Sequence, residues 1–154
     1  MTNKQKPARQ RRLDRTFDAA PSYFLTLCTA DRIGIPDLPA YFERVKIFVR
    51  NSTAHYGIWV DSYVIMPDHV HLIVTSGRNS VVTIGQWVKA FKAVTADKKF
   101  RWQKGFFDHV LRSEESRSEK WDYIRMNPVR AGLVERSVDW LYAEQFRRYD
   151  GEKL

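Results

Sequence analysis

Cysteine is almost absent from this chain, which has one, Cys28, among 154 residues. A single thiol cannot form an intrachain disulfide, and its place in a β-type run predicts a small buried side chain. The fourfold Cys/His signatures of structural zinc are also missing, so we do not expect a site of that kind. We expect a protein of the reducing cytoplasm.

Long apolar runs are missing too. No segment approaches the roughly 20 apolar residues that a membrane span requires. Residues 1–15 are basic but are not followed by the small-residue cleavage site of a signal peptide. There is no internal repeat, no low-complexity tract and no linker between core-sized segments. With 44% hydrophobic residues, the chain is expected to form one domain, neither exported nor membrane-bound.

Acidic residues are outnumbered: the chain has 26 Lys and Arg but 18 Asp and Glu, which gives a net charge of +8. This excess favours a polyanionic partner such as nucleic acid. It is concentrated in residues 1–15 and 89–104, each with six basic residues and one acidic. We expect residues 1–20 to form a flexible basic arm, either a solvated tail or a DNA-binding arm that includes Arg9, Arg11 and Arg12.

Alternating and helical apolar patterns predict strands at 23–30, 58–66, 69–75 and 106–112, and helices at 39–57, after Ser80, and at 114–127. Ser80 is the expected cap of the second helix. Its expected apolar face is Ile84, Trp87, Val88, Phe91 and Val94, flanked by Lys89, Lys92 and Lys99. Pro67-Asp68 forms a tight hairpin turn between the middle strands.

The resulting order is βαββαβ plus a helix, which predicts an α+β fold of the ferredoxin-like kind. Its antiparallel sheet would carry helices on one face and leave the other available for a ligand. The added C-terminal helix carries Tyr123. We expect residues 137–154 to pack on the same domain, with 137–150 as a terminal helix or an irregular arm.

Two histidines stand one residue apart in the stretch VIMPDHVHLIV, residues 64–74. On a strand, His69 and His71 project from the same face, so their imidazoles could hold a divalent metal with positions open for substrate oxygens. The alternative is that both rings are satisfied polar groups at a sheet surface.

A second candidate is Tyr123 in YIRMNPVRAGLV, residues 123–134. It lies about 200° around the expected helix from Trp121, off the apolar side. It is either an ordinary surface residue or a nucleophile, which would need a metal-polarised electrophile or a nearby cation. Asn127, one turn later, is either a further metal ligand or, with Pro128, the start of a short helix ended by Gly132.

Together, DHVHLIV and YIRMNPVRAGLV resemble the HUH single-strand endonuclease superfamily, and more closely the REP-associated tyrosine transposases. The resemblance covers roughly residues 23–134, within an expected catalytic domain of residues 21–136. It implies that His69 and His71 bind Mg²⁺ or Mn²⁺, that Tyr123 is the nucleophile, and that Asn127 takes a third ligand position where relatives often have glutamine.

The resemblance further implies a bacterial transposase, associated with the nucleoid, that cuts single-stranded DNA beside palindromic hairpin repeats through a 5′-phosphotyrosine intermediate. Phosphate contacts are expected from Lys89, Lys92, Lys99, Arg101 and Lys104. Trp102 either stacks on a base or belongs to the core. His109 either lies near the site or has a structural role in the fourth strand. For the oligomeric state, the resemblance is compatible with a monomer and with a dimer. Two other functions remain: a nonenzymatic nucleic-acid-binding regulator and an HUH replication or mobilisation nickase.

Overall fold

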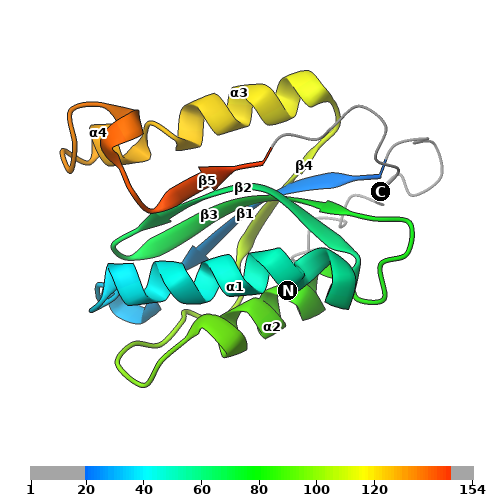
Figure 1. Ribbon diagram of the computed structural model, residues 1–154, viewed down its shortest axis with the longest axis horizontal. Helices are drawn as coiled ribbons and strands as arrows, with labels where there is room; N and C mark the ends of the chain where they lie inside the picture. The colour runs from blue at the N-terminus through cyan, green and yellow to red at the C-terminus, as the bar shows by residue number, and fades with distance from the viewer. Residues whose placement is uncertain (1–19, 147–154) are drawn as a thin grey trace, which may run out of the picture.

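The computed structural model describes residues 20–146, which form an antiparallel sheet with the strand order β4-β1-β3-β2-β5 (Figure 1). The strands are β1 Ser22–Cys28, β2 Ile58–Met66, β3 His69–Ser76, β4 Phe107–Leu111 and β5 Ala143–Gln145. The helices are α1 Leu38–Tyr56, α2 Ile84–Thr95, α3 Glu114–Ile124 and α4 Asn127–Arg130, with 3₁₀ turns at Ala30–Arg32 and Ser137–Asp139. The predicted α+β class is confirmed.

Helices α1 and α2 cover one face of the sheet and α3 lies over the other (Figure 1). Because side chains alternate along a strand, Val70, Leu72 and Val74 of β3 enter the apolar core beneath α1 and α2. Ile73 instead belongs to a smaller cluster with Ile124 of α3. Each central strand therefore supplies one face for packing and another for the region below α3.

The ends of α1 agree with the sequence pattern. The Asp37 side chain caps its first turn by accepting a hydrogen bond from the backbone N–H of Ala40, 3.0 Å away. Gly57 ends it in the left-handed region, at φ 69°. A Cβ atom there would lie 2.7 Å from the Cα of Ser80, so glycine is required for space as well as conformation.

Helix α2 differs from the expectation in three respects. Its cap is Thr83, which forms a capping box with Gln86, while the Ser80 hydroxyl donates to the carbonyl of Val82. Val94 is 57% exposed and does not belong to the buried face. Lys99 lies beyond the last helical residue, so it does not share a flank of this helix.

Helix α3 ends at Ile124, three residues earlier than predicted. A separate short helix, α4, begins at Asn127, and Pro128 occupies its first turn, where a missing N–H costs nothing. Gly132 follows with φ 74°, as expected for the end of this segment. Tyr123 therefore stands close to the end of one helix and the start of the next.

The described part of residues 137–150 contains a short strand rather than the terminal helix that was one of the two expectations. It makes the turn Ser137–Asp139 and then a fifth strand, β5, paired with Ser62, Tyr63 and Val64 of β2. The Tyr63 hydroxyl donates to Glu144 at 2.8 Å, which fastens this strand. Within residues 20–146, no helix has the length and apolarity needed to cross a bilayer.

Candidate metal and nucleophile site

The two histidines of β3 lie on the face beneath α3. Their ring centroids are 4.7 Å apart, with the ring planes at 77°. The register with β1 places Thr26 opposite His71 and Cys28 opposite His69. Alternation along the strand thus brings two imidazoles together, as their spacing predicts.

His71 is fixed by its two neighbours on β1. Its Nδ1 atom is 2.9 Å from the Thr26 hydroxyl, and its ring stacks on Phe24 with 5.2 Å between centroids. Burial, aided by the charge of His69 and of nearby cations, lowers the pKa of His71 to about 3. The ring is therefore neutral near pH 7, which is the form that binds a metal ion.

His69 is oriented by a carboxylate. Its Nδ1–H donates to Oδ1 of Asp68 at 2.7 Å, and Nε of Arg32 donates to Oδ2 of the same group at 2.9 Å. Partial burial by itself would raise the pKa of Asp68, but the hydrogen bonds from His69 and Arg32 lower it below its usual value. Asp68 thus stays ionised and fixes the His69 ring.

Arg32 reaches Asp68 from an unusual backbone conformation. Arg32 and its neighbour Asp31 have φ values of 56° and 54°, in the left-handed region that non-glycine residues rarely adopt. Such residues cost about 1–3 kcal/mol each and persist only where surrounding contacts hold them. Here the contact is the Arg32–Asp68 ion pair, which connects this turn to His69.

The donor set fits a divalent ion held by two protein ligands. With Nδ1 of His69 and His71 engaged by Asp68 and Thr26, the Nε2 atoms are the ring nitrogens left for a metal. Residues 20–146 contain no group of three or more His, Cys, Asp or Glu side chains that could hold an ion. A site of this composition leaves positions for substrate oxygens.

Tyr123 is 58% exposed, near the end of α3, and two cations flank its ring. The guanidinium carbon of Arg130 lies 4.2 Å from the ring centroid, and Nζ of Lys120 lies 5.7 Å from it. Nη2 of Arg130 also donates to the Tyr123 carbonyl at 2.8 Å and to the side-chain oxygen of Asn127. Asn127 is thus engaged with Arg130 in this structure.

The tyrosine and the histidines are linked through two side chains. Nζ of Lys120 lies 4.8 Å from the Phe24 ring centroid, and that ring stacks on His71. Lys120 also lies near the Tyr123 ring, so α3, which carries Tyr123, lies over the face of the sheet that holds His71. The ring contacts of Tyr123 are with the two cations rather than with the imidazoles.

The predicted phosphate-binding residues fall into separate places. Arg101 and Lys104 line a hollow of about 550 Å³ together with Arg32, whose partner Asp68 holds His69. Lys92 instead donates to the carbonyls of Gln103 and Gly105, so it secures the loop that forms this hollow. Only part of the basic zone is thus joined to the histidine site.

The remaining candidates are more peripheral. Lys89 is exposed on α2, and Lys99 is exposed in the loop after it. Trp102 packs against Phe100, with centroids 5.3 Å apart, and against Tyr41, so it has a core role although it also lines the hollow. His109 is exposed on β4 opposite Phe24, on the face that carries His71. Arg9, Arg11 and Arg12 lie outside the described residues.

Sequence reasoning missed the residues that support the site. Asp68 could have been found, because it precedes His69 and a carboxylate often orients a metal-binding histidine. Thr26 and Phe24 required the pairing of β1 with β3. Arg32 and Arg130 required tertiary contacts that no local pattern contains.

Comparisons with known proteins identify related chains. The chain is 27% identical over 154 residues to a Haemophilus influenzae protein named provisionally as a REP-associated tyrosine transposase, covering 90% of this chain and 87% of that one. It is 29% identical over 86 residues to the REP-associated tyrosine transposase of Escherichia coli, covering 54% of this chain and 52% of that protein.

A similar fold occurs in the solved structure of a REP-associated tyrosine transposase bound to a REP hairpin. The TM-score is 0.66 and the identity 23%, over 84% of this chain and 79% of that one. The sequence pattern of the family described as "Transposase IS200 like" matches residues 20–125. This match spans more than half of the sequence, and the chain belongs to the IS200-like transposase family.

Proposed function

We propose that this transposase is a metal-dependent single-stranded DNA endonuclease and strand transferase, acting at or near palindromic hairpin repeats through a 5′-phosphotyrosine intermediate. The observation that carries the proposal is that His69 and His71 lie on the sheet face beneath α3, the helix of Tyr123, and that Lys120 of α3 lies near both the Tyr123 ring and the Phe24 ring that stacks on His71. The hairpin substrate is suggested by the relatives named as REP-associated and by the related structure with a REP hairpin.

The proposed fold is a ferredoxin-like βαββαβ unit extended by β5, with α3 as the added helix that carries the tyrosine. The strand order β4-β1-β3-β2 with antiparallel neighbours supports it. In this proposal residues 21–136 form the catalytic domain, residues 1–20 a basic arm, and residues 137–154 an arm packed on the same domain.

His69 and His71 would hold Mg²⁺ or Mn²⁺ through their Nε2 atoms. When bound, the ion neutralises charge on a nonbridging phosphate oxygen of the DNA. Asp68 and Thr26 keep both imidazoles in the orientation that this requires. Asn127 becomes a third ligand only if its side-chain oxygen leaves Arg130.

Tyr123 would supply the nucleophile. Its phenol oxygen forms a bond to phosphorus while the bond from phosphorus to the 3′ oxygen breaks, and the phenol proton leaves for solvent or for the departing oxygen. Lys120 and Arg130 beside the ring favour the negative charge that develops on the phenol oxygen. The covalent phosphotyrosine conserves an ester bond, so a second 3′-OH can later displace the tyrosine without ATP.

One assay tests this function. A labelled oligonucleotide with a palindromic hairpin and single-stranded flanks is incubated with the protein and Mn²⁺, Mg²⁺ or EDTA, and resolved on a denaturing gel. We expect a covalent adduct only with a metal ion. A binding-only regulator would shift the oligonucleotide on a native gel and leave it intact with every metal, which would overturn the proposal.

A further inference from the structure

Helix α3, which carries Tyr123, has little apolar surface with which to hold its place on the sheet. Of the residues Glu114–Ile124, all described by the structure, Ile124 alone is buried, in the smaller apolar cluster that contains Ile73. Trp121 packs against the same cluster and is partly buried. Both residues lie in the second half of the helix, and apolar contacts have no preferred direction. The first half of α3 is therefore held by other contacts.

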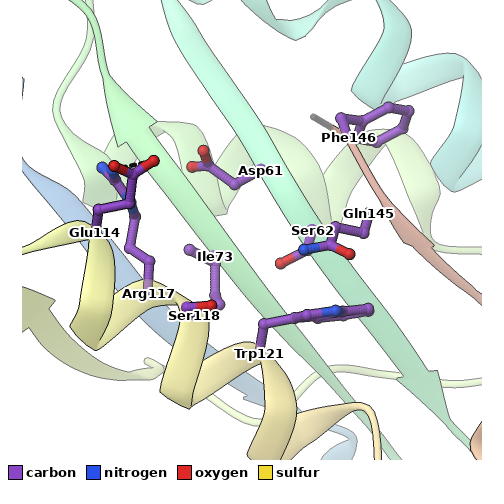
Figure 2. A pocket seen from close by; sticks show the side chains of 9 residues that line it. All are labelled: Asp61, Ser62, Ile73, Glu114, Arg117, Ser118, Trp121, Gln145 and Phe146. Carbon is purple, nitrogen blue, oxygen red and sulfur yellow. Dashed lines mark ion pairs between the residues drawn. The ribbon is translucent and has the colours of Figure 1, made fainter. Parts of the chain in front are cut away.

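Arg117 supplies an attachment for that first half. It lies seven residues before Ile124, which is close to two full turns and places both side chains on the same side of the helix. Arg117 and Asp61 line a pocket of about 260 Å³, Arg117 from α3 and Asp61 from β2 (Figure 2). The Arg117 side chain is 20% exposed, and its Nη1 donates to the hydroxyl of Ser22 on β1 at 3.0 Å.

From Ser22, hydrogen bonds continue across the three central strands. The hydroxyls of Ser22 and Thr75 are 2.8 Å apart, and Thr75 donates to Asp61 at 2.7 Å. Since each hydroxyl has one proton, Ser22 donates to Thr75 while its oxygen accepts from Arg117. The network thus runs in one direction, from a cation on α3 through β1 and β3 to a carboxylate on β2.

The part of this network within the sheet is rigid. Ser22 and Thr75 are 1% and 0% exposed, and buried hydrogen bonds of this kind strengthen one another. The β2–β3 register shifts between Val60 and Ser62, so Asp61 is the extra residue of a β-bulge. Bulges often redirect a side chain near a functional site. Arg117 is therefore attached at a fixed place on the sheet.

The ion pair of Arg117 with Glu114 does not explain this attachment. Its nitrogen and oxygen atoms are 4.0 Å apart, and the Glu114 side chain is 91% exposed (Figure 2). Exposed pairs of this kind contribute little to stability. Both residues also belong to α3, so a bond between them cannot fix the helix to the sheet.

The rotation of α3 decides where Tyr123 points. Tyr123 lies about 100° around the helix from Ile124. Side chains lie about 5–6 Å from a helix axis, so a rotation of about 10° would move the tyrosine by about 1 Å. A misplacement of about 1 Å can slow an enzymatic reaction about 10²-fold.

We propose that Arg117 is a positioning residue, whose bond to the sheet fixes the rotation of α3 and thereby the place of Tyr123 relative to His71. Ile124 holds one end of the helix and Arg117 the other. The inference rests on the proposed function, since it takes Tyr123 as the nucleophile. It concerns the attachment of the helix rather than the chemistry of cleavage.

Single-turnover kinetics separate positioning from stability. The hairpin oligonucleotide with single-stranded flanks is mixed with saturating folded protein and Mn²⁺, and the rate constant of adduct formation is measured. Arg117→Met removes the donors and should lower this rate constant about 10²-fold. Arg117→Lys, which keeps a donor, should recover part of the rate, and Glu114→Gln should keep all of it.

Binding is the second readout of these variants. Affinity for the hairpin in EDTA and affinity for Mn²⁺ should be the same in Arg117→Met as in the unchanged protein. An unchanged rate constant, or a loss of rate explained by weaker binding of either ligand, would overturn the inference.

The route through the hydroxyls has its own test. Ser22→Ala removes the acceptor of Arg117 and is a second variant should Arg117→Met fail to fold. It should lower the rate constant by the same factor. Residues of one network are not additive, so the double variant should be no slower than either single variant. Effects that multiply would show that Arg117 does not act through Ser22, and would overturn the inference.

The position of Tyr123 can also be measured without metal or DNA. A nitroxide is attached at Phe107→Cys, an exposed position of β4 opposite Thr26, while the natural Cys28 is buried. The tyrosines are replaced by 3-fluorotyrosine, and the fluorine signal that Tyr123→Phe lacks identifies residue 123. The paramagnetic relaxation of this signal depends on its distance from the nitroxide.

This relaxation should change in Arg117→Met and stay the same in Glu114→Gln. If the unchanged protein forms no adduct but the relaxation changes in Arg117→Met, the proposed function fails and the positioning role stands. If the adduct forms, and Arg117→Met alters neither its rate constant nor the relaxation, the positioning role fails and the proposed function stands.

Discussion

The two faces of the sheet are built from the same strands but differ in chemistry. Beneath α1 and α2, the buried residues are almost entirely apolar, as with Val70, Leu72 and Val74 of β3. Beneath α3, the same strand presents His69, His71 and Thr75, each hydrogen-bonded to another side chain. One face is therefore an apolar core, while the other combines a smaller apolar cluster with polar groups held in fixed positions.

Because side chains alternate between the two faces of a strand, β3 contributes both to the apolar core and to the candidate site. Leu72 and His71 are neighbours in sequence, yet Leu72 is fully buried in the core and His71 belongs to the candidate site. Substitutions on the α3 face should impair DNA processing more than folding. Substitutions on the other face should have the opposite effect.

The largest effect is expected for Tyr123→Phe. Removal of the phenol oxygen should reduce covalent adduct formation by at least about 10³-fold, as when another enzyme loses its covalent nucleophile. Stability should hardly change, because the side chain is 58% exposed. Adduct yield on a denaturing gel and urea denaturation measure the two quantities. An adduct that persists in this variant would show that another residue is the nucleophile.

A paired substitution at His71 and Leu72 tests the two faces directly. Leu72→Ala should lower the free energy of unfolding by about 2–5 kcal/mol, because it opens a cavity in the core. His71→Ala should cost less stability but eliminate metal-dependent cleavage. Urea denaturation and cleavage by the folded fraction report these effects. A larger stability loss for His71→Ala than for Leu72→Ala would contradict the division of the faces.

A smaller effect is expected for Asp68→Asn. The amide keeps the size of the carboxylate but weakens the hold on His69 and loses the ion pair with Arg32. Affinity for Mn²⁺, measured by titration calorimetry, should fall about 10–100-fold, as for other partners of metal-binding histidines. Asp139→Asn, which breaks an ion pair at the turn Ser137–Asp139, is the matched control. If the affinity for Mn²⁺ is unchanged, Asp68 does not orient His69 for metal binding.

The smallest effect concerns the basic hollow beside the site. Arg101→Gln should reduce the slope of log affinity against log salt by about 1, because one phosphate contact is lost. Arg50→Gln, at an exposed position of α1 that does not line the hollow, should leave the slope unchanged. Salt titrations of hairpin binding check both variants. If the two variants have equal slopes of log affinity against log salt, Arg101 does not contact a DNA phosphate in this hollow.

Much of the fold could be predicted because its signals are local. The strand Ile58–Met66 has the predicted bounds, and Asp37, Pro39 and Gly57 mark the ends of α1 with side-chain and backbone chemistry that depends on few neighbours. The prediction that Ser80 caps α2 was wrong because Ser80 and Thr83 are both residue types that suit an N-cap. The Gln86 side chain, which completes the capping box, favours Thr83.

The site was predictable only in part. The shared face of His69 and His71 follows from the two-residue period of a strand. Strand β5 was missed, because Ala143–Gln145 has no strong β pattern and is ordered by pairing with β2. The ion pair of Arg32 with Asp68 and the stacking of Arg130 on Tyr123 join residues distant in sequence or on different helices. Such contacts exist only after the chain has folded.

Strand β5 also affects how the protein behaves when crowded with copies of itself. An uncovered sheet edge can pair with the edge of another molecule and begin aggregation. By pairing with Ser62, Tyr63 and Val64, β5 shields the middle of the nine-residue strand β2. The opposite edge is the short strand β4, whose Asp108 and His109 are hydrophilic. Short or polar borders of this kind help a nucleic-acid enzyme remain dispersed at high local concentration.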